Sequence, residues 1–357
     1  MTTRAAPASA QDDDDLFAGL SRLRPDYAPT PLLDLPALAG RSGVGRVWVK
    51  DESVRPLGNF KSLGGVFASL RALVRATGAP GVEALLSSLG KYRLPALVTA
   101  SDGNHGLSVA TAARLAGAPA RIYLPASVPT ARSDRIAAAG AEVVRIDGTY
   151  DAAVDAAALA ARSGDALLVP DTGDRVDDTV LDDVMTGYGL IAREIAGQLG
   201  GVWPTHLFVQ AGVGGLAAAM AKAFAELIAD PPLTIAVEPA SADCVARALA
   251  SGSPELVPGE LDTSAEMLAC GLASAHAVAL LRKHGAKAIA VSEARLHEAV
   301  AAMIESGGPA TTPSGACGLA GLLEASGNRD SRHRFGLSTE SNVLLVVSEG
   351  QVPGASA

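Results

Sequence analysis

The sequence predicts an α/β protein in which mostly parallel, twisted sheets are flanked by helices. Short apolar runs, typical of buried strands, alternate with stretches of helical periodicity along most of the chain. The length of 357 residues is sufficient for two lobes, each with its own core. We therefore expect a two-lobed fold built from βαβ units, in which helices join parallel strands.

The first half of the chain supplies one series of elements. Strands are predicted at residues 46–50, 96–100, 121–124, 141–146 and 166–169. A helix is predicted from residue 59, which would cap it, through residue 73, with Phe60, Leu63 and Phe67 on one face. Further helices are expected at residues 82–89, 105–115, 132–139 and 150–161.

An acidic, irregular segment at residues 171–183 is the best candidate for a crossover between the lobes. Beyond it, helices are predicted at residues 184–199, 215–227, 275–284, 293–306 and 315–325. Strands are predicted at residues 206–210, 234–237, 288–291 and 342–347.

The composition narrows the classes of partner. A net charge of −9 argues against nucleic acid or an anionic membrane as the main partner. Three scattered cysteines without metal-ligand spacing fit a reduced protein and predict neither disulfides nor a metal site. No run is apolar and long enough to cross a bilayer, and the N-terminus lacks the apolar core of a secretory signal, so we expect a cytoplasmic protein.

Lys61 lies where a predicted strand leads into a predicted helix, beside Gly64 and Gly65. The positive end of the helix should favour its neutral amine, which can form an imine with an aldehyde. A solvated lysine at a helix start is the alternative, and this stretch alone favours that alternative.

Two loops follow buried strands, where open α/β sheets bind ligands. The loop at residues 101–106 opens a helix, and its free backbone N–H groups would hold a carboxylate; a capped turn with a surface histidine is the alternative. The loop at residues 210–216 contains Gly212, Gly214 and Gly215, and its converging amides would hold a phosphate. Taken alone, this second loop is explained equally well as a plain tight connection.

Together these motifs resemble those of the fold-type II enzymes dependent on pyridoxal phosphate, the tryptophan synthase β superfamily. The resemblance runs from Thr30 to Gly350. It implies a two-lobed fold, pyridoxal 5′-phosphate as cofactor, a small amino acid as substrate, and a homodimer. We predict a disordered acidic leader at residues 1–15, a large cofactor-binding domain at residues 16–95 plus 176–357, and a small substrate-loop domain at residues 96–175.

The resemblance assigns roles to single residues. Lys61, in the pair Phe60-Lys61, would hold the cofactor as a Schiff base, Asn104 would contact its 3′ oxygen, and Ser348 would face its ring nitrogen. Residues implied for the substrate carboxylate are Ser101, Gly103, Asn104 and His105. Residues implied for the cofactor phosphate are Gly212, Val213, Gly214, Gly215 and Leu216.

Within the superfamily the sequence is most similar to diaminopropionate ammonia-lyase, because Asp102 stands in the carboxylate loop where Ser or Ala is more usual. This likeness implies β-elimination on 2,3-diaminopropionate, giving pyruvate and ammonia. Lys61 and Asp102 would act as bases on opposite faces of the cofactor, so that both enantiomers react. Asp102 or Asp171 would hold the leaving ammonium, although a turn-capping role for Asp171 is an equally good interpretation.

One departure leaves other functions open. The subgroup has Gln-Asp-Thr-Ala-Trp-Glu-Gly-Tyr near its substrate, whereas residues 170–175 read Pro-Asp-Thr-Gly-Asp-Arg here and lack the Trp and Tyr. A dehydratase or β-replacement enzyme acting on serine, threonine or another β-substituted alanine is therefore the second hypothesis. A non-catalytic relative that binds the cofactor is a weaker third, since Lys61, Asn104 and Ser348 are all present.

Overall fold

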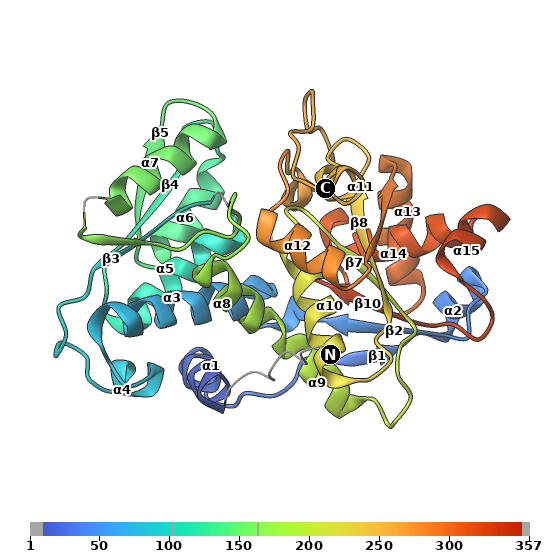
Figure 1. The fold of residues 1–357 in the computed structure, drawn as a ribbon, viewed down its shortest axis with the longest axis horizontal. Coiled ribbons are helices and arrows are strands. Elements are labelled where there is room, and N and C mark those ends of the chain that lie inside the picture. Colours follow the sequence, from blue (N-terminus) through green and yellow to red (C-terminus); the bar gives the residue numbers. More distant parts are fainter. Residues whose placement is uncertain (1–9, 102, 163, 352–357) are drawn as a thin grey trace. The chain divides into compact units, whose positions relative to one another are not determined.

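The chain folds into two compact units, each an α/β arrangement around its own sheet (Figure 1). The structure is a computed structural model that describes residues 10–101, 103–162 and 164–351. The first unit contains the described residues of Met1–Ala28, Lys61–Asp171 and Asp178–Tyr188. The second contains Pro29–Phe60, Thr172–Asp177 and the described residues from Gly189 onward. Parallel sheets with interspersed helices confirm the predicted fold class.

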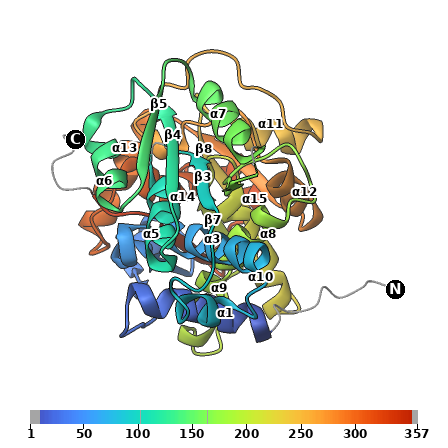
Figure 2. The same cartoon turned by 90° about the vertical axis from the view of Figure 1, so that its left-hand side faces the viewer.

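The first unit is built on a four-stranded parallel sheet in the order β5-β4-β3-β6. Figure 2 faces this sheet and shows β3, β4 and β5 side by side. The strands are β3 (Ala96–Ala100), β4 (Ala120–Pro125), β5 (Glu142–Ile146) and β6 (Ala166–Leu168). The helices are α1 (Ala10–Leu23), α3 (Lys61–Thr77), α4 (Val82–Leu86), α5 (Asn104–Ala116), α6 (Thr130–Ala138), α7 (Tyr150–Arg162) and α8 (Thr179–Tyr188).

The second unit is built on a six-stranded sheet in the order β1-β2-β10-β7-β8-β9, in which only β1 runs antiparallel to its neighbour. The strands are β1 (Leu32–Asp34), β2 (Arg46–Asp51), β7 (His206–Gln210), β8 (Leu233–Pro239), β9 (Lys287–Val291) and β10 (Asn342–Val347). The helices are α2 (Pro36–Ser42), α9 (Leu190–Gln198), α10 (Gly215–Leu227), α11 (Cys244–Ser251), α12 (Ala275–Lys283), α13 (Glu293–Glu305), α14 (Pro313–Ser326) and α15 (Arg329–Phe335). Single 3₁₀ turns occur at η1 (Glu52–Val54), η2 (Pro56–Gly58) and η3 (Glu266–Leu268).

The core of the second unit explains why its central strands read as continuous apolar runs. From Val343 to Val347, every residue of β10 is buried, because helices cover both faces of a parallel sheet. Helix α14 packs directly on this sheet. A side chain at Gly318 would come within 2.6 Å of the Phe208 carbonyl oxygen, so only glycine permits that approach.

The structure corrects three predicted boundaries. Residues 10–15, predicted as part of a disordered leader, form the first turns of α1, where Asp15 binds Arg71 at 2.7 Å and accepts the Val82 N–H. The rest of the predicted leader lies outside the described residues. Residues 16–28, 61–95 and 178–188, predicted for the large domain, belong to the first unit, in which α3 packs against α5 and α8. Residues 172–175, predicted for the small domain, belong to the second unit.

The third correction concerns the helix predicted at residues 184–199. It is two helices, α8 and α9, separated at Gly189 and belonging to different units. An apolar pattern that continues through a break cannot reveal it, because both helices bury one face. Asn59 is also not the cap of α3; it forms a bridge with Glu349 instead. Within the described part of the chain no helix has the length and hydropathy that a membrane crossing requires.

Candidate active site

The first unit brings Lys61 and Asp171 together. Lys61 is the first residue of α3, and its Nζ lies 2.7 Å from Oδ2 of Asp171, three residues after the end of β6. The two side chains remain partly accessible, with 26% of Lys61 and 16% of Asp171 exposed. This ion pair requires the ammonium form, so the expected neutral amine is not the form that the pair favours.

The pKa of Asp171 follows from this environment. Burial alone would raise the pKa of the carboxyl group, but the charge of Lys61 and the hydrogen bond that Lys61 donates outweigh this effect. The pKa is lowered to about 2 as a result. Asp171 is therefore an anion at neutral pH, suited to holding a cationic group rather than donating a proton.

The carboxylate loop precedes α5 in the same unit. Gly103 is the N-cap residue, and Asn104 and His105 form the first turn, whose N–H groups are not used by hydrogen bonds within a helix. A side chain at Gly106 would come within 2.9 Å of the Ser101 carbonyl oxygen, so the loop must fold tightly over the helix start. This is a suitable anion-binding geometry. Asp102, the proposed second base, lies outside the described residues.

The ring of His105 is not on the surface, contrary to the alternative interpretation of this loop. It is completely buried, and its Nε2 lies 2.8 Å from the carbonyl oxygen of Val169. Because a carbonyl only accepts, Nε2 carries the hydrogen. Burial lowers the pKa of His105, against the charge of Asp171, which keeps the ring neutral. Any contact of His105 with a substrate carboxylate must therefore come from its backbone.

The first turn of α3 is fixed by close packing against α8. A side chain at Gly64 would clash with the ring of Tyr188 and the carbonyl oxygen of Val184, and one at Gly187 would come within 2.7 Å of Gly64 Cα. The two helices therefore cross at glycines, one turn after Lys61. Tyr188 is buried, and burial raises the pKa of its phenol, so it packs this crossing as a neutral side chain.

The second unit contains the glycine loop between β7 and α10. Gly214 has φ of +97°, a conformation that favours glycine. The carbonyl oxygen of Gly212 accepts from Sγ of Cys244 at 3.2 Å, and that of Val213 accepts from the Ser274 N–H at 3.0 Å. In a trans peptide the N–H points opposite to the C=O, so the next two N–H groups are directed away from Cys244 and Ser274.

Ser348 directly follows β10 and is buried in the second unit. Its carbonyl oxygen accepts the Phe60 N–H at 3.0 Å, and the Gly350 N–H donates to Gly58 at 3.2 Å. The segment that leads into Lys61 is therefore attached, up to Phe60, to the end of β10.

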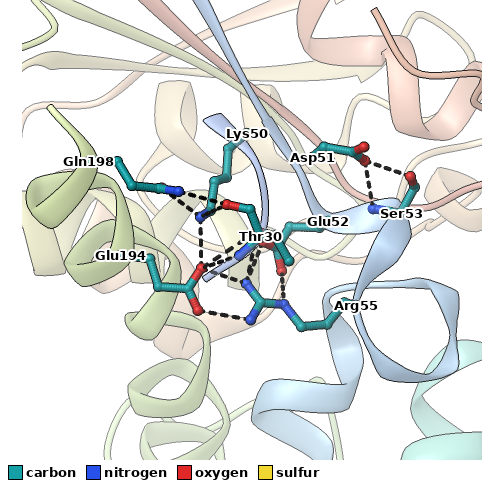
Figure 3. Close-up of polar contacts among 8 residues, drawn as sticks. All are labelled: Thr30, Lys50, Asp51, Glu52, Ser53, Arg55, Glu194 and Gln198. Atoms are coloured by element: carbon teal, nitrogen blue, oxygen red, sulfur yellow. Dashed lines mark hydrogen bonds and ion pairs between the residues drawn. The ribbon is translucent and has the colours of Figure 1, made fainter. Parts of the chain in front are cut away.

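The start of the same segment is held by a buried polar cluster that the sequence analysis missed (Figure 3). Arg55 donates to Glu52 at 2.6 and 2.8 Å and to both oxygens of Glu194 at 2.8 Å, while Lys50 lies 2.7 Å from Glu194. We call these four charged side chains the buried charge cluster, and their formal charges sum to zero. Thr30 and Gln198 complete its hydrogen bonds. Lys50, Glu52 and Arg55, charged residues at and just after the end of a buried strand, were the feature of the sequence that could have indicated this cluster.

The predicted site residues thus divide between the units. Those in the first unit are Lys61, Ser101, Gly103, Asn104, His105 and Asp171. Those in the second are Phe60, Gly212, Val213, Gly214, Gly215, Leu216 and Ser348. Among the described residues, no group of three or more His, Cys, Asp or Glu side chains could hold a metal ion.

The sequence of the chain matches that of known proteins. A family model described as "Pyridoxal-phosphate dependent enzyme" matches residues 23–349. The chain is 32% identical to the diaminopropionate ammonia-lyase of Salmonella typhimurium, over 91% of this chain and 86% of that protein. It is 29% identical to the biosynthetic L-threonine dehydratase of Mycobacterium tuberculosis, over 98% of this chain and 81% of that protein.

Solved structures agree with the sequence matches. The holo diaminopropionate ammonia-lyase of Escherichia coli superposes with a TM-score of 0.84 at 29% identity, covering 98% of this chain and 91% of that one. A threonine deaminase from T.th. superposes with a TM-score of 0.76 at 28% identity, covering 98% of this chain and 100% of that one.

Proposed function

The chain belongs to the pyridoxal-phosphate dependent enzyme family, and on that premise we propose that it is a diaminopropionate ammonia-lyase. The reaction is a β-elimination that converts 2,3-diaminopropionate and water into pyruvate and two molecules of ammonia. The observation that carries the proposal is the ionised carboxylate of Asp171 beside the Lys61 amine, because it matches a substrate with a cationic β-substituent.

The residues of each unit fit pyridoxal phosphate. In the first unit, the amine of Lys61 would hold the aldehyde group, and Asn104 would contact the 3′ oxygen. In the second unit, the glycine loop would bind the phosphate through the N–H groups that are directed away from Cys244 and Ser274, and the hydroxyl of Ser348 would face the ring nitrogen. When bound, the cofactor supplies a conjugated ring that acidifies the α-proton of an amino acid.

The chain's own residues then divide the remaining work. The helix start at Asn104 and His105 would bind the substrate carboxylate through backbone N–H groups. Lys61, as a free amine, would take the α-proton of the L-isomer. Asp171 would bind the β-ammonium and keep it protonated until it departs as ammonia. For the D-isomer, Asp102 would take the α-proton instead.

The second candidate is a dehydratase that acts on serine or threonine. The match to an L-threonine dehydratase over 98% of this chain favours it, as does the loss of the Trp and Tyr of the ammonia-lyase motif after Asp171. A hydroxyl leaving group is neutral, however. The anionic carboxylate of Asp171 would then have no cationic group of the substrate to bind. For this reason we place it second.

One assay separates these functions. The purified holoenzyme is incubated with L- and D-diaminopropionate, both serines and threonine, and pyruvate or 2-oxobutyrate and ammonia are followed. We expect turnover of both diaminopropionate isomers and a larger loss with the D-isomer in Asp102→Asn. The control, Lys61→Ala, should be inactive and lack the yellow imine band. Turnover of serine or threonine alone would rule out the ammonia-lyase.

We further propose that the active form of the protein is a cytoplasmic homodimer, as is usual in the family that the motifs resemble. Light scattering after size-exclusion chromatography should then give a mass near twice the 35.9 kDa of one chain. A mass of one chain at micromolar concentration would contradict the dimer.

A further inference from the structure

His105 is a buried, polar residue close to the candidate site that the mechanism above uses only through its backbone. Its side chain makes one hydrogen bond within the described part of the chain, from Nε2 to Val169, and its Nδ1 atom has no hydrogen-bond partner there. A neutral imidazole in a fully buried position costs free energy unless its polar atoms are used. The hydrogen bond to Val169 is therefore the contact through which the buried ring can contribute to the structure.

That bond holds the end of the strand that carries Asp171. The Val169 N–H still donates to Val98 in the sheet at 2.9 Å, but Pro170, which follows, has no N–H to continue the pattern. Asp171 comes immediately after Pro170. The bond from His105 to the Val169 carbonyl is thus the last described attachment of the backbone before the Asp171 side chain reaches Lys61.

The helix that carries His105 is also packed against the helix that carries Lys61. A side chain at Gly65, one turn after Lys61, would come within 2.6 Å of Ser108 Cβ and 3.5 Å of His105 Nδ1. Helices α3 and α5 are therefore in close contact at the level of His105. Lys61, His105 and Asp171 are therefore connected in three ways. The helices that carry Lys61 and His105 pack against each other, His105 hydrogen bonds to the end of the strand before Asp171, and Asp171 forms an ion pair with Lys61.

We propose that His105 is a positioning residue that holds Asp171 against Lys61 through the Val169 carbonyl and thereby sets the preference of the site for a cationic β-substituent. The first half of this statement rests on contacts within one unit. The second half rests on the proposed function.

Two substitutions separate positioning from simple burial. His105→Met supplies an apolar side chain of similar length without a donor, whereas the amide of His105→Gln can place a donor near the position of Nε2. The matched control is His206→Met in the second unit, since His206 is also buried and its Nε2 lies 2.9 Å from the carbonyl oxygen of Phe335. Both methionine variants should lower the melting temperature.

The first readout is the reactivity of Lys61 in the cofactor-free full chain, measured by mass spectrometry after limited treatment with an amine-acylating ester. Only a neutral amine reacts, so a well-placed Asp171 protects Lys61. We expect faster acylation in His105→Met and in Asp171→Asn, and wild-type rates in His105→Gln and His206→Met. In the Asp171→Asn background, His105→Met should add nothing, because the two residues act as one unit.

The second readout is specificity in the holoenzyme. His105→Met should lower the ratio of kcat/KM for diaminopropionate to that for serine about tenfold, and Asp171→Asn should remove this effect. If His105→Met does not fold, His105→Asn, whose amide is too short to reach Val169, replaces it. Equal acylation of Lys61 in wild type and His105→Met, or equal effects of His105→Met with and without Asp171, would overturn the inference. An enzyme inactive on diaminopropionate but with the expected acylation pattern would reject the proposed function and keep the positioning role.

Discussion

At the scale of single residues, the carboxylate of Asp171 and the amine of Lys61 meet at 2.7 Å although 110 residues separate them in the chain. The sequence analysis named both residues but treated a turn-capping role for Asp171 as equally good. The structure shows the carboxylate bound to Lys61, and the charge and hydrogen bond of Lys61 lower its pKa to about 2. While it is paired with Lys61, the carboxylate is an anion throughout the physiological pH range.

Asp171→Asn tests that role. The amide cannot neutralise a β-ammonium, so kcat/KM for diaminopropionate should fall by about 100-fold, because removing one partner of a buried charge pair costs about 2–5 kcal/mol. The loss with serine should be much smaller, since its β-hydroxyl carries no charge. Steady-state kinetics on both substrates measure the difference. Equal losses on the two substrates would show that Asp171 supports the fold or the cofactor instead.

At the scale of elements, the position of Lys61 depends on how α3 crosses α8. The crossing uses Gly64 and Gly187, and no pattern of apolar residues predicts it, because glycine adds nothing to helical periodicity. The sequence analysis noted Gly64 only as a neighbour of Lys61 in the chain. Its described neighbours are the ring of Tyr188 and the backbone of α8.

Gly64→Ala should therefore destabilise the protein by about 1–3 kcal/mol through overpacking, even though alanine favours a helix. It should also reduce activity, because the first turn of α3 carries Lys61. Urea unfolding and the diaminopropionate assay measure the two effects. The matched control is Gly197→Ala in α9, where a side chain would meet nothing within 4 Å. There alanine should be neutral or stabilising, and a Gly64→Ala variant that behaves the same would contradict the packing argument.

At the scale of the whole molecule, the buried charge cluster connects parts of the second unit that are far apart in sequence (Figure 3). Thr30 and Glu194, 164 residues apart, hydrogen bond directly, and both contact Arg55. Burial raises the pKa of Glu194, but the hydrogen bond and charge of Arg55 and the charge of Lys50 outweigh it and lower the pKa to about 2. The cluster fixes α9 and the strand before Lys61 to each other.

Glu194→Gln should destabilise the protein by about 3–5 kcal/mol, because it leaves buried positive charge uncompensated. The pH dependence has a definite sign. A carboxyl group whose pKa drops on folding stabilises the fold above its unfolded pKa of 4.5, and the contribution is lost as the pH falls towards 2. Wild type should therefore lose more stability than Glu194→Gln between pH 5 and 3, measured by urea midpoints.

The control for this prediction is Asp177→Asn, which removes an exposed partner of Arg175. Its effect should stay within about 0.5 kcal/mol, as for most surface pairs. Parallel pH profiles of wild type and Glu194→Gln would contradict the assignment of the low pKa to Glu194.

The sequence predictions were accurate where a feature depends on residues close together in the chain, and failed where it depends on contacts between distant residues. Strands β7 and β10 were located with the bounds that the structure has, because burial on both faces leaves a continuous apolar run. The break at Gly189 and the assignment of α3 to the first unit were missed, because each is decided by packing against distant elements. The buried charge cluster was missed for the same reason: Lys50, Glu52 and Arg55 look like an ordinary polar loop until Glu194 is placed beside them.

The sequence by itself determined the alternation of strands and helices, the glycine loop at residues 212–216 and the motifs that identify the cofactor, since all of these are local patterns of residue type. The tertiary structure alone decided that Asp171 faces Lys61, that the ring of His105 turns inward to Val169 and that Glu194 completes the buried charge cluster. The physical reason is that Coulomb and hydrogen-bond energies depend on distances in space, and in a single sequence those distances become defined only when the hydrophobic cores assemble.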